Sequence, residues 1–132
     1  MNRKYFKLAA MVAESKSDKR QFHIGACGIR SDGSIVISSN GPVRLDGELR
    51  KSFGPAHSEA RLAKKLDVGA TVYVVRVSKV NMSWTLARPC QSCQRILRSR
   101  GVKKVFYTIS DNEYGVMYLN NKPETTHRLG KR

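Results

Sequence analysis

The alternation of apolar and polar positions predicts three helices along the chain. In residues 3–16, apolar side chains recur at the i, i+3, i+4 and i+7 positions, which is the period of an amphipathic helix. The members of this stripe are Tyr5, Leu8, Ala9 and Val12. We expect the stripe to pack against a sheet.

The second and third helices are predicted further along the chain. Residues 57–67 fit a helix, because small and apolar side chains share one side. In residues 89–101, Pro89 supplies a first helical position and Gly101 a helix terminator. The predicted inward stripe of this third helix is Cys90, Cys93, Ile96 and Leu97.

Period-two and β-branched patterns predict five strands. These are residues 22–29, 34–38, 71–77, 102–109 and 114–119. An Asp32-Gly33 turn joins the first two strands into a hairpin. The third strand is almost entirely β-branched or aromatic, which is typical of a central strand. The link between the last two strands is too short for a crossover helix, so we expect these strands to be antiparallel.

The order of these elements predicts a three-layer α/β/α fold with a mixed five-stranded sheet. Residues 1–119 should form a single domain, since a chain of 132 residues fits one hydrophobic core. The polar and basic residues 120–132 are predicted to be a flexible tail. Residues 39–56 contain several Gly and Pro with little periodicity, so we interpret them as a long loop, and loops of this length are uncommon unless they are functional or mobile.

The composition is unusually basic. The chain has 25 Lys and Arg against 10 Asp and Glu, which gives a formal charge of +15. Such a surface attracts polyanions in a salt-dependent way, although the same charge also serves solubility. Because no long apolar run or signal-peptide region is present, we expect a cytoplasmic protein without a membrane segment. The three cysteines cannot all pair within the chain, which favours reduced thiols.

Four residues favour a zinc site. Cys90 and Cys93 are three positions apart at a predicted helix start, so both thiols fall on one face, where the helix N-terminus stabilises the metal-binding thiolate form. His57 would complete three protein ligands and leave a fourth position open for an acidified water, which is typical of catalytic zinc. Glu59, two residues from His57, could carry protons between that water and a substrate.

Other interpretations of these residues remain open. A Cys-x-x-Cys pair also occurs in redox motifs and in closed structural zinc sites, and a closed site would require a fourth ligand. The remaining histidines, His23 and His127, belong to no obvious motif. Redox chemistry, in turn, would not require His57 and Glu59. Cys27 is expected to pack as a small buried hydrophobe.

The segments His-Ser-Glu at 57–59 and Pro-Cys-Gln-Ser-Cys at 89–93 resemble the signature of the cytidine deaminase-like superfamily. The resemblance covers nearly the whole chain, up to about Leu119. It implies the cytidine deaminase-like fold and a zinc cofactor.

The resemblance also implies roles for individual residues. Zinc would be held by His57, Cys90 and Cys93, with Glu59 as the proton shuttle. The backbone N–H groups of Ser58 and Cys90 would help to place the base. Ser58 departs from the alanine that is usual at this position in the family, and its hydroxyl adds a hydrogen-bond donor.

Features of the sequence resemble three branches of the superfamily, and these branches act on different substrates. Residues 39–42 (Ser-Asn-Gly-Pro) resemble the Gly-x-Asn loop of deoxycytidylate and tRNA adenosine deaminases, so Asn40 is a candidate for contacting sugar or base, or else a turn residue. Residues 4–13 also resemble small phage and bacterial deoxycytidylate-type deaminases, whereas the short link between the last strands resembles free cytidine deaminases. His-Ser-Glu and the basic charge resemble polynucleotide editors, including plant RNA editing domains.

We therefore expect a homo-oligomeric zinc-dependent hydrolytic deaminase. It would convert cytosine to uracil in a (deoxy)cytidine nucleoside or nucleotide, with zinc-bound hydroxide as the nucleophile. Cations available for a single substrate phosphate are Arg44, Arg50 and Lys51.

Two alternatives are kept. The first is a cytosine or adenosine deaminase of single-stranded DNA, RNA or tRNA. Its basic track would be Arg95, Arg98, Arg100, Lys103, Lys104, Arg128, Lys131 and Arg132, with Trp84, Phe53 or Tyr114 as stacking platforms. The second is a catalytically silent, zinc-stabilised nucleic-acid-binding protein, which would not need Glu59.

Overall fold

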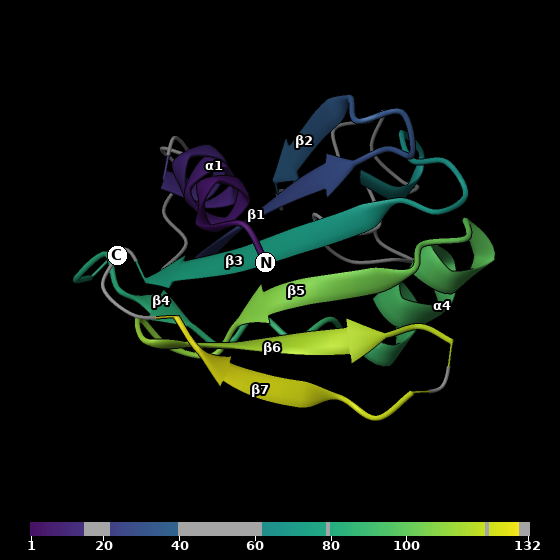
Figure 1. Ribbon diagram of the computed structural model, residues 1–132. Coiled ribbons are helices and arrows are strands. Elements are labelled where there is room, and N and C mark those ends of the chain that lie inside the picture. The colour runs from purple at the N-terminus through teal and green to yellow at the C-terminus, as the bar shows by residue number, and fades with distance from the viewer. Residues whose placement is uncertain (15–21, 40–61, 79, 121, 130–132) are drawn as a thin grey trace, which may run out of the picture.

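A seven-stranded mixed sheet forms the centre of the molecule (Figure 1). The computed structural model describes residues 1–14, 22–39, 62–78, 80–120 and 122–129. Its helices and strands are α1 (Arg3–Glu14), β1 (Phe22–Ile29), β2 (Ile35–Ser39), β3 (Thr71–Ser78), β4 (Trp84–Thr85), α4 (Gln91–Ser99), β5 (Lys104–Thr108), β6 (Glu113–Tyr118) and β7 (Thr125–Arg128). The strand order is β2-β1-β3-β5-β6-β7, and β4 pairs with β3 off this path.

The pairing of β5 with β6 is antiparallel, as predicted from the short link between them. The turn is closed by a hydrogen bond of 2.9 Å from the Ile109 N–H to the Glu113 carbonyl. Among the described strands, β3 and β5 form the one parallel pair, and all other pairs are antiparallel. The mixed sheet is therefore confirmed, with seven strands where five were predicted.

The two additional strands lie in segments that carry no alternating apolar pattern. β4 has two residues and pairs with Arg76 and Val77 of β3. β7 replaces part of the predicted flexible tail: its four residues are polar and exposed, and it pairs antiparallel with β6. Leu129, directly after β7, is only 2% exposed and packs in the cluster that contains Phe6. Part of the predicted tail, Thr125–Arg128, is thus a paired strand, and a buried leucine follows it.

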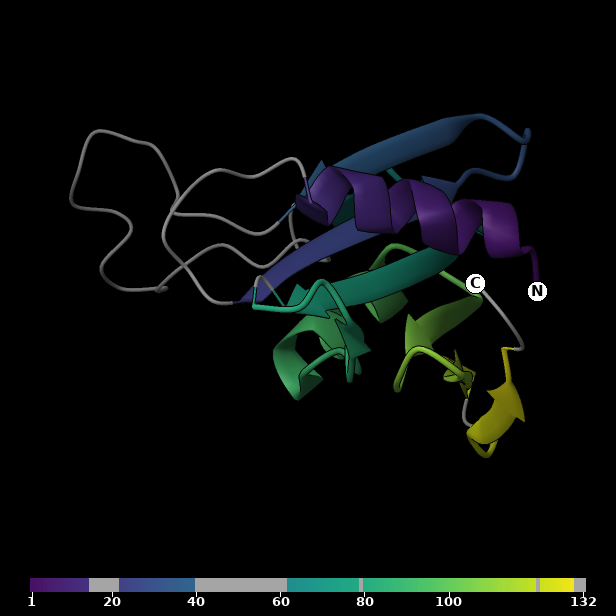
Figure 2. The same ribbon diagram turned by 90° about the vertical axis from the view of Figure 1, so that its left-hand side faces the viewer.

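Helix α1 covers one face of the sheet (Figure 2). Its buried residues are Phe6, Ala9, Ala10 and Ala13. They follow the same i, i+3, i+4, i+7 spacing as the predicted stripe, but the predicted members Tyr5, Leu8 and Val12 are only partly buried. Small alanines face the sheet because the helix lies directly on β1: a Cβ atom at Gly25 would stand 2.9 Å from the Ala13 nitrogen. The helix prediction is confirmed, and the predicted stripe was correct for Ala9 and wrong for Tyr5, Leu8 and Val12.

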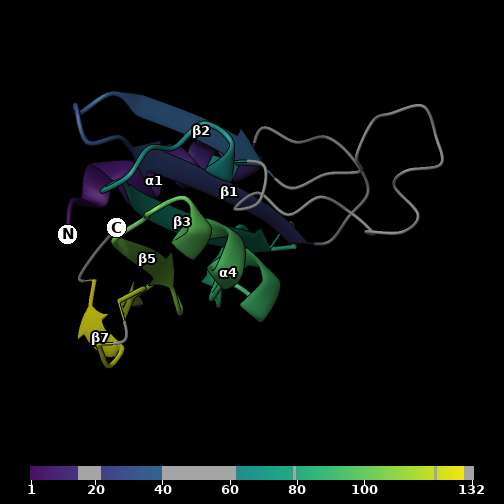
Figure 3. The ribbon, with the colours of Figure 1, turned by 90° about the vertical axis from the view of Figure 1, so that its right-hand side faces the viewer.

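The opposite face of the sheet is covered by α4 and by the residues around Leu62 (Figure 3). The described end of the second predicted helix is helical at Leu62 and Ala63. Leu62, Leu66 and Leu97 pack with sheet residues such as Val72 in one buried cluster. With α1 on one face and α4 on the other, the predicted three-layer arrangement is confirmed. No helix within the described residues is long and apolar enough to span a membrane.

Candidate metal centre

Two cysteines lie at the N-terminal end of α4. Cys90 is the N-cap of the helix, with φ −70° and ψ 167°, and its side chain makes no capping hydrogen bond. Cys93 lies in the first turn and is 2% exposed, whereas Cys90 is exposed. The helix begins at Gln91, so Pro89 precedes it by two positions rather than opening it. The predicted inward stripe is correct for Cys93 and Leu97 and wrong for Cys90 and for Ile96, which is 38% exposed.

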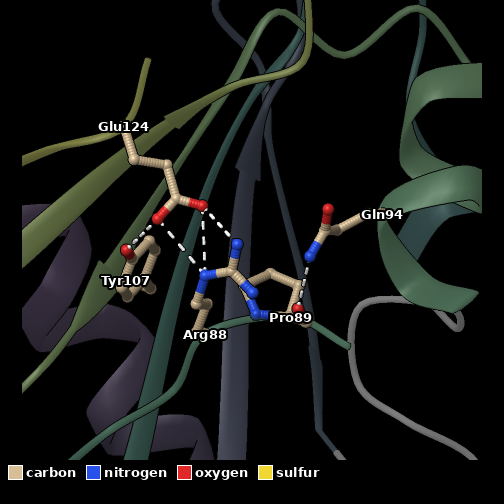
Figure 4. A network of polar contacts seen from close by, with 5 residues as sticks. All are labelled: Arg88, Pro89, Gln94, Tyr107 and Glu124. Atoms are coloured by element: carbon tan, nitrogen blue, oxygen red, sulfur yellow. Dashed lines mark hydrogen bonds and ion pairs between the residues drawn. The ribbon is translucent and has the colours of Figure 1, made fainter. Parts of the chain in front are cut away.

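The backbone of the segment 86–90, which leads to Cys90, is held from both sides. Before the cysteine, the Ala87 N–H donates to the Thr108 carbonyl of β5 at 2.9 Å. After it, the Gln94 side-chain amide donates to the Pro89 carbonyl at 2.8 Å (Figure 4). The Gln94 backbone N–H donates to the Cys90 carbonyl at 2.9 Å. The start of α4 is thus anchored on the carboxyl end of β5.

A polar network lies beside this segment (Figure 4). The Nε atom of Arg88 donates to both carboxylate oxygens of Glu124, at 3.0 and 3.2 Å, and its Nη2 atom donates to Oε1 at 2.5 Å. The Tyr107 hydroxyl donates to Oε2 of the same carboxylate at 2.7 Å. The Arg88 hydrogen bonds lower the pKa of Glu124, and the Glu124 hydrogen bond raises the pKa of Arg88. Burial and the Glu124 carboxylate raise the pKa of Tyr107 to about 12.

Gly115 makes room for the Tyr107 ring. The two residues are paired across β5 and β6, and Gly115 is paired in turn with Thr126 of β7. A Cβ atom at position 115 would stand 2.5 Å from the Tyr107 hydroxyl oxygen and 2.7 Å from its Cε2 atom. The ring therefore passes over β6 at the glycine, which lets the hydroxyl reach the start of β7.

The described part of the predicted zinc site fits a metal that prefers thiolates. Cys90 and Cys93 bring two sulfur ligands to one helix start. All three cysteines of the chain are described and none is in a disulfide. The other predicted site residues, Asn40, His57, Ser58 and Glu59, lie in 40–61, outside the described residues. Within the described residues, no group of three or more His, Cys, Asp or Glu could hold a metal ion.

The sheet register places Ser39 at the same end of the sheet as the segment that leads to Cys90. Ser39, the last described residue before Asn40, is paired with Gly25, which is paired with Val75. The adjacent row joins Val74 to Tyr107 on β5. Residue 39 therefore ends β2 level with the carboxyl end of β5, where the segment to Cys90 is bound. Ligands of open α/β sheets bind at such carboxyl ends.

The remaining candidate ligands lie elsewhere. Cys27 is fully buried on β1, in the cluster beneath α1, as predicted for a small hydrophobe, and burial raises the pKa of its thiol to about 11. His23 is fully buried on the same strand. His127 lies on β7, where its ring stacks on Tyr114 at a centroid distance of 5.1 Å. Neither histidine is in a described cluster with Cys90 and Cys93.

The basic residues proposed for a nucleic-acid track do not all share one face. Arg95, Arg98 and Arg100 are exposed on and just after α4. Lys104, by contrast, lies over the Phe106 ring, which belongs to the cluster beneath α1 on the opposite face. Of the suggested stacking platforms, Trp84 is 4% exposed and Tyr114 stacks on His127, while Phe53 lies outside the described residues. Burial removes Trp84 as a platform.

No protein-family model and no curated protein sequence matches the chain. Solved structures do. Cytidine deaminase from Burkholderia pseudomallei has a TM-score of 0.65 at 16% identity, covering 92% of this chain and 94% of that one. Cytidine deaminase from Mycobacterium leprae has a TM-score of 0.55 at 17% identity, covering 89% and 92%. Cytidine deaminase from Mycobacterium tuberculosis has a TM-score of 0.53 at 16% identity, covering 90% of each chain. The chain thus has the cytidine deaminase fold, as the sequence resemblance implied.

Proposed function

We propose that the chain is a zinc-dependent hydrolytic deaminase that converts the cytosine base of a (deoxy)cytidine nucleoside or nucleotide to uracil. The observation that carries the proposal is the position of Cys90 and Cys93 at the N-terminal end of α4, over a sheet with the cytidine deaminase fold. The sequence supplies His57 and Glu59 as the partners that this chemistry requires. The cytidine deaminases of similar fold support the substrate class.

The reaction adds water to C4 of cytosine and breaks the bond from C4 to the exocyclic nitrogen, which leaves as ammonia. His57, Cys90 and Cys93 would hold the zinc ion. When bound, zinc supplies a Lewis acid that makes water acidic near neutral pH. Glu59 would take a proton from the attacking water and deliver it to the ring nitrogen, and would then carry the proton of the new C4 hydroxyl to the leaving amine. Asn40 and the backbone N–H groups of Ser58 and Cys90 would orient the nucleoside.

A polynucleotide substrate is the second candidate. Residues 68–110 contain no Asp or Glu and eight Lys or Arg, which include the three exposed arginines at α4. A single substrate phosphate needs one or two cations, whereas a strand with many phosphates would use such a surface. Binding through many phosphates weakens steeply between roughly 50 and 200 mM salt, so a flat salt response of oligonucleotide binding would exclude this candidate.

Turnover with a panel of substrates tests the proposal. Zinc-loaded protein would be incubated with deoxycytidine, deoxycytidylate, single strands that contain cytosine and a tRNA stem-loop that contains adenosine. We expect deoxyuridine and deoxyuridylate from the monomers and a loss of roughly 10²- to 10⁴-fold in kcat for Glu59→Gln. Glu113→Gln, the same change at an exposed residue of β6, is the control. Turnover of strands alone would favour the polynucleotide enzyme, and no turnover at all would favour a silent zinc-stabilised binder.

Metal content tests the ligand assignment separately. Cys90→Ser and Cys93→Ser should each reduce bound zinc well below one per chain, because the thiolate supplies both charge and affinity. Cys27→Ala should keep its zinc, since Cys27 lies beneath α1 on the opposite face from α4. Equal zinc in the wild type and in all three variants would contradict the assignment. The proposed homo-oligomer and its cytoplasmic location remain predictions, and sedimentation of the zinc-loaded protein would test the first.

A further inference from the structure

A carboxylate far along the chain is bound to the segment that carries the first cysteine. We infer that Glu124, acting through Arg88, is a positioning residue that holds Cys90 ready to bind metal, an inference that rests on the proposed metal site at Cys90 and Cys93. Glu124 does not touch the cysteines in any described contact; it acts on the residue two positions before Cys90.

The chain between Arg88 and Cys90 has little freedom to absorb a movement of Arg88. The residue between them is Pro89, whose ring fixes φ near −65°, and Pro89 is fully buried. The backbone on either side is held by the Ala87–Thr108 and Gln94–Pro89 hydrogen bonds. The Arg88 side chain is thus a further restraint on the same short segment, and a shift of its guanidinium is transmitted to the N-cap of α4.

The geometry of the Arg88–Glu124 ion pair is suited to orienting the Arg88 side chain more than to stabilising the fold. Arg88 presents Nε and Nη2 together to the Glu124 carboxylate, so the pair is bidentate and fixes direction as well as distance. The side chains are 46% and 31% exposed, and exposed ion pairs contribute little to folding free energy. Removing the bridge should therefore disturb the placement of the segment more than the stability of the fold.

The carboxylate is itself held by a rigid anchor. Tyr107 is 3% exposed, and its hydroxyl reaches Glu124 only because Gly115 leaves the space above β6 open. Residues 68–110 around Arg88 contain no acidic residue, so the partner comes from the segment that enters β7. The residue directly before β7 thereby supplies a side chain to the surroundings of the candidate metal centre.

Cobalt binding tests the inference without reference to turnover. Reduced, metal-free full-length protein would be titrated with Co²⁺, and affinity would be read from the absorption band of cobalt–thiolate bonds. We expect Glu124→Gln to weaken Co²⁺ binding by about 10-fold or more, the effect typical of residues that orient metal ligands. Glu113→Gln removes the same charge from an exposed site of β6 and should bind as the wild type does.

Rescue and stability separate positioning from folding. The double change Arg88→Glu with Glu124→Arg restores an ion pair in reverse and should recover part of the affinity that each single change loses. The thermal midpoint of metal-free Glu124→Gln should stay within a few degrees of that of Glu113→Gln. If Glu124→Gln binds Co²⁺ as tightly as Glu113→Gln does, the inference is overturned. It is also overturned if the weaker binding of Glu124→Gln is accompanied by a large fall in its thermal midpoint, because the loss would then come from unfolding.

The outcome also separates this inference from the proposed function. One outcome would support the positioning role and contradict the proposed deaminase. In it, the wild type forms the cobalt–thiolate band but deaminates no substrate, and Glu124→Gln binds Co²⁺ more weakly than the wild type does. If the wild type is an active deaminase and Glu124→Gln binds Co²⁺ equally well, the proposed function is supported and the positioning role is contradicted. A wild type that forms no cobalt–thiolate band would overturn the inference together with its metal site.

Discussion

Gly25 of β1 lies directly beneath Ala9 of α1, so close that a Cβ atom at position 25 would overlap the Ala9 carbonyl oxygen. The neighbouring backbone atoms belong to a helix and cannot rotate away as a side chain would. We expect Gly25→Ala to lower the free energy of unfolding by about 2–3 kcal/mol, because α1 must move off the sheet. Urea denaturation measures this change.

The control is a glycine with open space around it. Gly33, in the turn between β1 and β2, has φ +90°, and a Cβ atom at this position would meet no other atom within 4 Å. Gly33→Asn, which tolerates positive φ, should cost less than about 1 kcal/mol. A Gly25→Ala protein as stable as Gly33→Asn would contradict the close approach of helix and strand.

Leu129 should be the main apolar anchor of the C-terminal strand. It is 2% exposed, its N–H bonds the Asn112 carbonyl at 2.6 Å, and its own carbonyl accepts from Arg3. Leu129→Ala should cost about 2 kcal/mol through lost burial and a residual cavity. Thr126→Ala, at an exposed position of β7, should stay within about 0.5 kcal/mol. Equal losses in the two variants would mean that Leu129 is not the anchor.

The Tyr107 hydroxyl predicts a dependence of stability on alkaline pH. Its pKa is raised to about 12 in the folded protein, above the value near 10 of an unfolded chain. A group with a raised folded pKa stabilises the fold fully below the unfolded pKa, and this contribution is lost as pH rises through the folded pKa. The stability advantage of wild type over Tyr107→Phe, about 1 kcal/mol at pH 8, should therefore shrink between pH 10 and 12. Paired urea titrations at pH 8 and above pH 10 measure the difference, and a constant advantage would argue against the burial of the hydroxyl and its hydrogen bond to Glu124.

The exposed Cys90 and the buried Cys27 should differ in their reactivity towards alkylating reagents. Cys90 is exposed at the start of α4, whereas Cys27 is fully buried and burial raises the pKa of its thiol to about 11. Alkylating reagents attack thiolates, so metal-free protein at pH 8 should be modified at Cys90 well before Cys27. Mass spectrometry of timed samples gives the order. Cys27 should react quickly only in urea, and rapid modification in the folded protein would contradict its burial.

The helices and strands with a strong periodic pattern could be predicted from the sequence. Which face of each element is buried could be predicted less well. The α1 stripe was predicted one position away from the true one, because alanines and larger apolar residues follow the same spacing. Only the sheet decides which stripe fits, since Gly25 requires small residues opposite it. Lys104 illustrates the same limit: it is close in sequence to the α4 arginines, yet β5 directs it to the other face.

The position of two predicted ligands could be predicted where it depends on local pattern. Cys90 and Cys93 lie at the start of α4, as the predicted third helix indicated. The Arg88–Glu124 ion pair could not be predicted, since it joins residues 36 positions apart and Glu124 directly precedes a strand with no apolar pattern. One sequence signal was present: Gly115 interrupts an otherwise β-prone strand, and such glycines often mark the close approach of another group. His57 and Glu59 remain predictions.

The parallel pairing of β3 with β5 has a consequence for how the fold opens. It divides the described sheet into two antiparallel units, β2-β1-β3 with β4, and β5-β6-β7. Antiparallel neighbours are local in sequence and tend to open together, so amide hydrogen exchange should reveal two cooperative units with different opening free energies. The segment to Cys90 bridges them, since it leaves β4 on one unit and is bound by Thr108 on the other. A metal held there would slow exchange in both units at once.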